Sequence, residues 1–217
     1  MRERNFTRST VRLGVSVILL CTIMLSFTIQ AHAYSTCGYK LKGSWYDDYY
    51  YVSPKSVTHN GSTVNYGTIA DSAVSEWNNA VNASTGHSLD ISLSETTNGS
   101  STTTRVVISP LDRGATGWRG FTYYYDYNYS TGEWYSVNYG GYPNQNYQAG
   151  SAVINLYYVH SNASWKKQNT IMHEMGHIFG LKHSSVTGAL MVSNSASYTS
   201  LKPPQSDDVN GVRSIYE

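Results

Sequence analysis

The hydrophobic positions of the chain follow a helical period in three segments, which are 68–81, 165–179 and 207–216. In the first segment an apolar residue recurs every four positions, and the resulting stripe consists of Ile69, Ala73, Trp77 and Val81. Thr68 is placed to cap this helix, as Ser206 is for the last one. In the middle segment the expected core face consists of Ile171, Met175, Ile178 and Phe179.

Shorter runs predict β-strands. Aliphatic, β-branched and aromatic residues favour strands at 89–93, 105–108 and 151–158. Residues 38–66 read as an extended, tyrosine-rich stretch, and the polar segment 95–104 reads as a surface loop. The mixture of helices and strands predicts a single α+β domain.

A tyrosine-rich segment lies in the middle of the chain, where residues 123–147 hold nine of its 20 tyrosines. Aromatic residues alternate over 121–129, a turn signal follows, and the alternation resumes, which predicts a β-hairpin within 121–147. One aromatic face could pack on the domain, or it could be an exposed surface that binds protein or polysaccharide. Oxygen ligands for Ca²⁺ could come from Asp126, Asn128 and Glu133, although their spacing matches no known calcium loop.

The first 33 residues have the composition of an export signal. Four arginines give a basic start, residues 13–29 are mostly apolar, and Ala31-His32-Ala33 supplies a small-x-small cleavage site. We therefore expect cleavage after Ala33 and one secreted, extracellular domain over 34–217, whose contact with a membrane is limited to export. The alternative is a leader that stays uncleaved and anchors the protein in the membrane.

The charge balance after the leader excludes some partners. The leader carries four arginines and one glutamate, so the remaining 184 residues hold 11 basic and 13 acidic side chains, a net charge of about −2. This gives no electrostatic reason to expect nucleic acid or an anionic membrane as a partner. Cys37 is the one cysteine that remains, so an intramolecular disulfide is excluded. We expect a monomer.

The segment HEMGHIFGLKH carries the candidate chemistry. His173 and His177 lie four residues apart, so a helix would place both imidazoles on one face, about one turn apart. The helix must end before position 183, and Gly180 tolerates the left-handed conformation that this requires. His183 can then fold back as the third ligand of one catalytic Zn²⁺, which leaves a fourth position for water or substrate.

Glu174 projects beside these histidines, where it can accept a proton from an attacking water as a general base. The sequence therefore predicts a zinc hydrolase. The alternative is a non-catalytic secreted binding protein that uses the tyrosine-rich hairpin, with zinc serving the fold alone. The presence of Glu174 favours the enzyme, because a structural zinc site needs no general base.

The same segment resembles the signature of the metzincin metalloproteases, which ends in a Met-containing turn below the metal. Met191 follows His183 by eight residues within HSSVTGALMVS, a spacing that resembles the matrixins, the matrix-metalloproteinase family. The end of the chain, SDDVNGVRSIYE, also resembles the last matrixin helix. Ser193 stands where astacins and serralysins carry a tyrosine ligand, which favours the matrixin branch.

The resemblance implies a metzincin fold with a twisted mixed β-sheet, about three helices, and an active-site helix above a Met-turn at Met191. It implies a zinc metalloendopeptidase that acts on protein or peptide substrates. Substrate would lie extended along a strand edge at 151–156, which includes Ala152, adding itself as a strand. Leu190 and Val192 would bound the pocket for the side chain that follows the cleaved bond.

Overall fold

The computed structural model describes residues 34–43, 48–83, 89, 91–139, 141–194 and 198–217. The chain divides into residues 1–32 and a compact unit over 33–217, to which all the described residues belong. The predicted leader, and with it the choice between cleavage and membrane anchoring, lies outside the described residues. Within them, no helix has the length and apolar composition needed to cross a bilayer.

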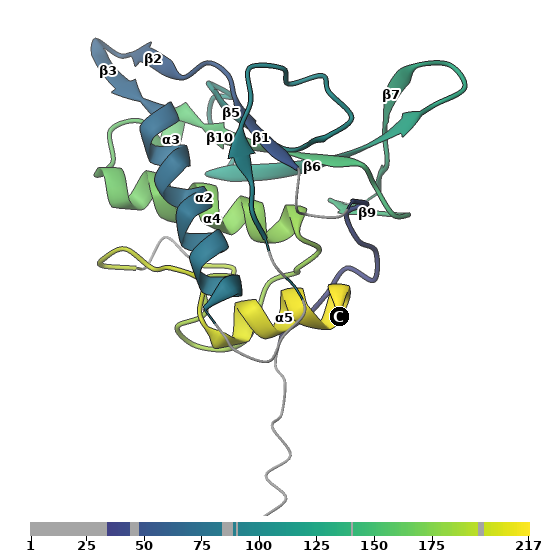
Figure 1. The fold of residues 1–217 in the computed structure, drawn as a ribbon. Helices are drawn as coiled ribbons and strands as arrows, with labels where there is room; N and C mark the ends of the chain where they lie inside the picture. The colour runs from purple at the N-terminus through teal and green to yellow at the C-terminus, as the bar shows by residue number, and fades with distance from the viewer. Residues whose placement is uncertain (1–33, 44–47, 84–88, 90, 140, 195–197) are drawn as a thin grey trace, which may run out of the picture. The chain divides into compact units, whose positions relative to one another are not determined.

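A six-stranded mixed sheet forms one layer of this unit (Figure 1). In spatial order its strands are β4 (Ser94–Glu95), β1 (Tyr49–Val52), β5 (Thr104–Leu111), β10 (Ala149–Asn155), β6 (Gly120–Asn128) and β7 (Glu133–Ser136). The first four run parallel, whereas β6 is antiparallel to β10, and β7 is antiparallel to β6. Two small hairpins add β2 (Ser56–His59) with β3 (Ser62–Asn65), and β8 (Asn138–Tyr139) with β9 (Tyr142–Pro143).

Helices cover one face of the sheet, where α4 contacts β10 and β6, and α2 packs against α4 (Figure 1). The helices are α2 (Tyr66–Asn82), α3 (Leu156–Val159), α4 (Ser164–Ile178) and α5 (Ser206–Tyr216). All three predicted helices are therefore present, and the short α3 is an addition. The expected core face of the middle helix is fully buried, and Trp77 of α2 donates a 2.9 Å hydrogen bond to the carbonyl of Met172. The α+β prediction is confirmed.

The helix caps differ from the prediction because neighbouring side chains satisfy the terminal amides. Asn65 accepts a hydrogen bond from the amide of Thr68 at 3.2 Å, so α2 begins before Thr68 and Asn65 caps it. Ser206 is the first residue of α5 rather than its cap. Gln205 is the N-cap residue of α5, and its backbone amide donates a hydrogen bond to the carboxylate of Asp208 at 2.8 Å.

The prediction of a strand at 89–93 is wrong, because side chains of helix α2, rather than a neighbouring strand, form hydrogen bonds with this backbone. The side-chain amide of Asn82 donates to the carbonyl of Ile91 and accepts from its amide, both at 2.9 Å. Asn78 binds the backbone of Leu93 in the same two ways. The apolar side chains enter the core while the ladder begins later, at β4. The strand predicted at 151–158 ends at Asn155, where α3 begins.

The predicted hairpin is present as β6 and β7, and its alternating aromatic residues lie on the outer face of the sheet. Tyr123 and Tyr125 are half-buried, whereas Thr122 and Tyr124 between them are buried. The buried pair faces α4, since Thr122 contacts the backbone carbonyl of Glu174 and Tyr124 that of His177. The face of β6 that packs on the domain is therefore the one that carries Thr122 and Tyr124. The face with the predicted alternating aromatic residues stays partly exposed.

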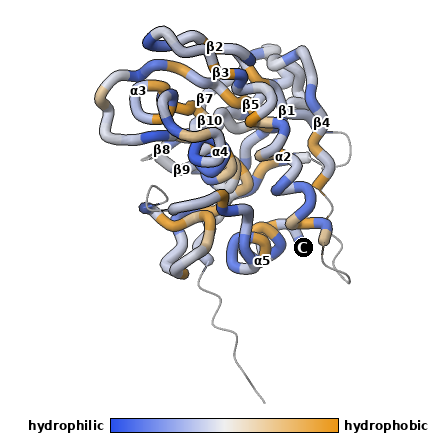
Figure 2. Tube along the Cα trace, turned by 90° about the vertical axis from the view of Figure 1, so that its left-hand side faces the viewer, coloured by the Kyte–Doolittle hydropathy of each residue, from blue (hydrophilic) through white to orange (hydrophobic). Residues whose placement is uncertain are grey.

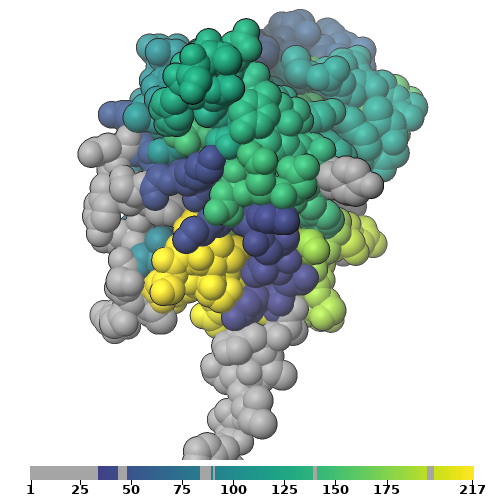
Figure 3. Space-filling view, turned by 90° about the vertical axis from the view of Figure 1, so that its right-hand side faces the viewer, coloured from purple at the N-terminus to yellow at the C-terminus, as the bar shows by residue number. Residues whose placement is uncertain are grey.

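Residues 34–43 lie between α5 and the hairpin, as Figure 3 shows for the purple segment beside yellow α5. Cys37 donates its amide to the carbonyl of Gly180 at 2.8 Å, and Lys182 donates its amide to the carbonyl of Ser35 at 2.7 Å. Helix α5 carries both hydrophobic and hydrophilic residues (Figure 2), and its inward Val212 is fully buried. The two ends of the described unit thus support the turn that follows α4.

Candidate metal centre

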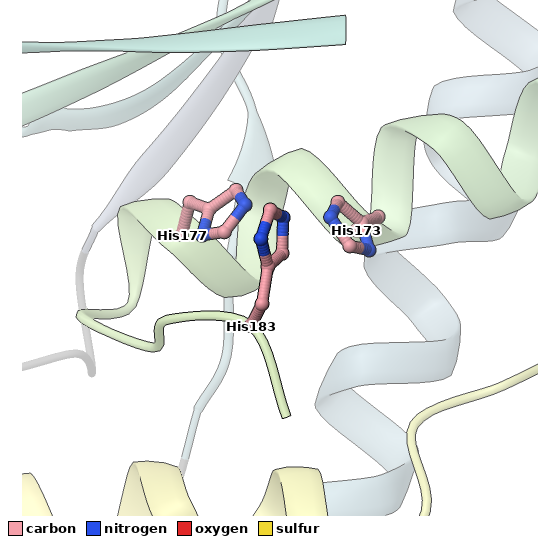
Figure 4. A group of neighbouring side chains, drawn as sticks. All are labelled: His173, His177 and His183. Atoms are coloured by element: carbon pink, nitrogen blue, oxygen red, sulfur yellow. The ribbon is translucent and has the colours of Figure 1, made fainter. Parts of the chain in front are cut away.

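Three histidines converge beside α4 (Figure 4). His173 and His177 project from one face of the helix, and their ring centroids are 4.9 Å apart. The chain leaves the helix at Gly180, whose φ of +94° is in the left-handed region, as the sequence predicts. The ring of His183 then returns to within 5.3 Å of His173 and 5.0 Å of His177. One ligand atom from each imidazole lies within 4.8 Å of the other two.

Backbone carbonyls fix the orientation of two of these rings. His173 donates from Nδ1 to the carbonyl of Leu190 at 2.9 Å, and His177 donates from Nδ1 to the carbonyl of Leu181 at 2.8 Å. Because a carbonyl can only accept, Nδ1 carries the proton and the lone pair remains on Nε2. Burial lowers the pKa of His173 to about 4, and it also lowers the pKa values of His177 and His183. The three imidazoles are therefore neutral near pH 7 and available to a metal.

This donor set fits a catalytic zinc ion, since three neutral imidazoles that converge from one side leave a fourth position open. Within the described ranges, it is the one group of His, Cys, Asp and Glu side chains placed to hold an ion. The suggested calcium site has no support among the described residues. Asp126 instead accepts hydrogen bonds from Lys42, Tyr135 and Gln145, and the Asn128 side chain accepts from the hairpin turn.

The carboxylate of Glu174 is buried beside the histidines and held by strand β6. Burial raises its pKa to about 7, while the hydroxyl of Thr122 counteracts this by donating to Oε2 at 2.8 Å. A β-carbon at Gly120 would lie 2.5 Å from Oε1 of Glu174, so a side chain at position 120 would clash with the carboxylate. Two strand residues thus fix the candidate base.

A cavity of about 300 Å³ brings these groups to the surface. Its lining consists of Gly117, Trp118, Arg119, Gly120, Thr170, His173, Glu174, His183, Ser193 and Asn194. The candidate base and two of the candidate ligands therefore share one solvent-reachable space, which is the arrangement that hydrolysis of a bound substrate requires.

Thr122→Val is expected to lower kcat/KM for peptide hydrolysis by about tenfold, with metal content unchanged. The variant removes the hydroxyl that orients Glu174. It also removes a hydrogen bond that lowers the pKa of the carboxyl, so the acid limb of the pH–rate profile should move to higher pH. Thr122→Ser should restore both, because it retains the hydroxyl. An unchanged rate and pH profile in Thr122→Val would contradict this role.

Met191 lies under α4 and is 1% exposed. A β-carbon at Gly176, between the two helical histidines, would meet the sulfur of Met191, so a larger residue at position 176 would displace this side chain. The carbonyl of Met191 accepts from the amide of Ser184 at 2.8 Å. Asp208 of α5 accepts from the amides of Leu190 and Met191 at 2.8 and 3.0 Å. The C-terminal helix therefore holds the turn whose Leu190 carbonyl orients His173.

The structure does not place the predicted substrate residues in the cavity wall. Ala152 is fully buried, and its strand β10 is paired with β5 on one side and β6 on the other, so it offers no free edge. The edge prediction is wrong because the antiparallel β6 follows β10 in the sheet. Leu190 is fully buried and Val192 is half-buried, while Ser193 and Asn194 supply the lining on this side.

Sequence reasoning missed three residues that support the site, namely Gly120, Thr122 and Asp208. A polar residue on the buried face of an aromatic strand was the available signal for Thr122. For Asp208 the sequence offers no such signal. Its contact with the Met191 turn joins segments 17 positions apart, which no local pattern reports.

The sequence profile of the Matrixin family of peptidases matches residues 76–217, which is more than half of the chain and includes the entire metal centre. The chain belongs to the matrixin family. Matrixins are zinc metalloproteases, so the family accounts for the histidine cluster and for the mixed α+β fold. It also implies protein substrates.

Comparison with solved structures finds a similarity to a chain described as "GM1 bound form of the ECX AB5 holotoxin". The sequence identity is 16%, the TM-score is 0.49, and the alignment covers 84% of this chain and 86% of that chain. Agreement at this level supports no statement about the matrixin-family protein. Comparison with curated protein sequences finds no match.

Proposed function

We propose that this matrixin-family protein is a secreted, zinc-dependent endopeptidase with Glu174 as its general base. The observation that carries the proposal is the convergence of three neutral imidazoles beside a buried carboxylate in one cavity. A structural zinc site would need neither the open position nor the base. The leader expected from the sequence supports export, with cleavage after Ala33.

His173, His177 and His183 would hold the ion, and a bound Zn²⁺ supplies Lewis acidity toward a peptide carbonyl and a nearby water. Glu174 accepts the proton of the attacking water and delivers it to the departing amine nitrogen. A pKa of about 7 suits both transfers, because the carboxyl can take and release a proton near neutral pH. Thr122 keeps Oε2 fixed, which leaves Oε1 for the transfer.

Strand β6 is the edge at which we propose that substrate binds. The backbone amide and carbonyl of Tyr124 face away from β10, toward Asn138 and Val137. The backbone N–H and C=O groups of the other even-numbered residues of β6 therefore also point away from β10, toward the outer edge of the sheet. β7 pairs with β6 only from Tyr125 onward. Among the described strands, none pairs with β6 on the outward side at Gly120, next to Glu174. An extended peptide that pairs there would present its backbone to the candidate base.

Removal and return of metal test the proposed function. After treatment with a zinc chelator, the purified protein is expected to lose hydrolysis of casein and of a quenched fluorescent peptide. One equivalent of Zn²⁺ should restore it, and Mg²⁺ should not, because magnesium prefers oxygen ligands. The mass of the exported protein separates cleavage after Ala33 from an uncleaved anchor.

Full hydrolysis by a preparation shown to be metal-free would overturn the proposed chemistry. Zinc bound at one ion per chain without hydrolysis of either substrate would favour the non-catalytic binding protein instead.

A further inference from the structure

A second cavity, of about 290 Å³, lies on the face of the sheet that turns away from α4. Its lining includes Ser100, Val107, Tyr125, Trp134, Ala149 and Ser151. Gly150 shows which face of the sheet this is. A β-carbon at Gly150 would point at Ile178 of α4, so the side chains of the adjacent residues, Ala149 and Ser151, point away from α4. The second cavity is therefore separate from the metal centre.

Trp134 forms the outer wall of the second cavity. Its indole nitrogen donates to the carbonyl of Ser100 at 3.3 Å, which links the hairpin to the loop before β5. Its ring packs against Tyr127 with centroids 5.2 Å apart. Trp134 and Tyr125 are both half-buried, so each offers part of a ring to solvent in a position fixed by its neighbours.

A row of aromatic side chains connects the two cavities along the outer face of β6. It begins at Trp118, which lines the metal cavity and packs against Phe121 with centroids 5.7 Å apart. Phe121 packs against Tyr123 at 4.9 Å, and Tyr125 follows two positions later at the second cavity. Alternate residues of a strand are about 6.7 Å apart, so the part of the row on β6 is extended and suits an extended ligand.

The lining of the second cavity identifies the chemistry of that ligand. It contains no Asp, Glu, Lys, Arg or His, so an ionic ligand would find no opposite charge there. Within the described part of the chain, the hydroxyls of Ser100 and Ser151 have no hydrogen-bond partner in the protein. A purely apolar ligand would strip water from these hydroxyls without replacing its hydrogen bonds. A neutral sugar ring offers a flat C–H face to the aromatic rings and hydroxyls to the two serines.

We propose that the second cavity and the aromatic row bind a neutral, extended polysaccharide, with Tyr125 and Trp134 as the stacking residues. The row reaches the metal cavity at Trp118. A bound polysaccharide would therefore keep the metal cavity close to proteins that are attached to the same polysaccharide. Tyr125 and Trp134 are neither candidate zinc ligands nor part of the lining of the metal cavity, so the proposed stacking does not depend on the proposed peptidase activity.

Titration of the purified protein with cellohexaose, a neutral β-1,4-linked glucose oligomer, tests the proposal by calorimetry and by changes in tryptophan fluorescence. Trp134→Ala and Tyr125→Ala are each expected to weaken binding by about tenfold, because each removes a stacking surface. Ser151→Gln should weaken it similarly by filling the cavity, while leaving the hairpin intact. Tyr157→Ala removes an equally large ring, 55% exposed on α3, and should bind as the unsubstituted protein does.

Glu174→Gln should bind cellohexaose with unchanged affinity, so a failure of the peptidase proposal would not be mistaken for a failure of this one. Absence of binding to both cellohexaose and the β-1,3-linked laminarihexaose would overturn the proposal. So would equal affinity in Ser151→Gln, Trp134→Ala and the unsubstituted protein. A rise in KM for casein in Trp134→Ala, without saccharide binding by the unsubstituted protein, would assign the surface to polypeptide instead.

Discussion

Glu174→Gln is expected to reduce peptide hydrolysis by at least about a thousandfold while the protein keeps its fold and its metal. The amide has the size of the carboxylate and can still accept the hydrogen bond from Thr122, so the cavity should not change. It cannot accept the proton of the attacking water, which removes general-base catalysis. The measurement is kcat/KM with a quenched peptide, alongside zinc content by atomic absorption.

Glu133→Gln is the matched control, because it makes the same substitution at an exposed position on β7. It should hydrolyse the peptide at the rate of the unsubstituted protein. If Glu174→Gln also did so with its zinc bound, Glu174 would not be the base, and the chemistry proposed for this cavity would be wrong.

His177→Ala is expected to weaken zinc binding by at least about a hundredfold. Changes to groups that merely orient a ligand already cost that much, and this variant removes a ligand itself. The remaining pair, His173 and His183, cannot hold zinc in a three-ligand site. Hydrolysis should fall with zinc occupancy, and both are measured on the same preparation after dialysis against a defined zinc buffer.

His160→Ala separates loss of a ligand from loss of a buried ring. His160 is 4% exposed, and its Nε2 lies 2.8 Å from the carbonyl of Ser62, away from the metal centre. This variant should lower the melting temperature yet retain one zinc per chain. Equal zinc affinity in His177→Ala and the unsubstituted protein would remove His177 from the ligand set.

The part of the site that the sequence predicts is the part built from neighbouring residues. His173, His177 and His183 lie within eleven positions, and helix geometry with one left-handed glycine is enough to bring them together. Met191 is close enough in sequence for its spacing to be informative. The burial of Ile171 and Met175 follows from the period of α4.

Contacts between distant segments could not be predicted in this way. Thr122 meets Glu174 across 52 positions, and Asp208 meets Leu190 across 18. The order of strands in the sheet also depends on contacts between distant segments, because the composition of a strand does not reveal whether another strand covers its edge. The prediction that substrate binds along the strand of Ala152 is wrong for this reason. In the hairpin, alternation separates two faces, but tyrosines occupy both, so hydrophobicity alone did not show which face is buried.

Asp208 of α5 accepts hydrogen bonds from the turn that carries Leu190 and Met191, and α5 is synthesised after that turn. Translation proceeds from the N-terminus, so the histidines emerge before α5. Until α5 emerges, the turn that carries Leu190 lacks the carboxylate that binds the amides of Leu190 and Met191. The backbone that orients His173 therefore gains this support only after the residues of α5 have been synthesised.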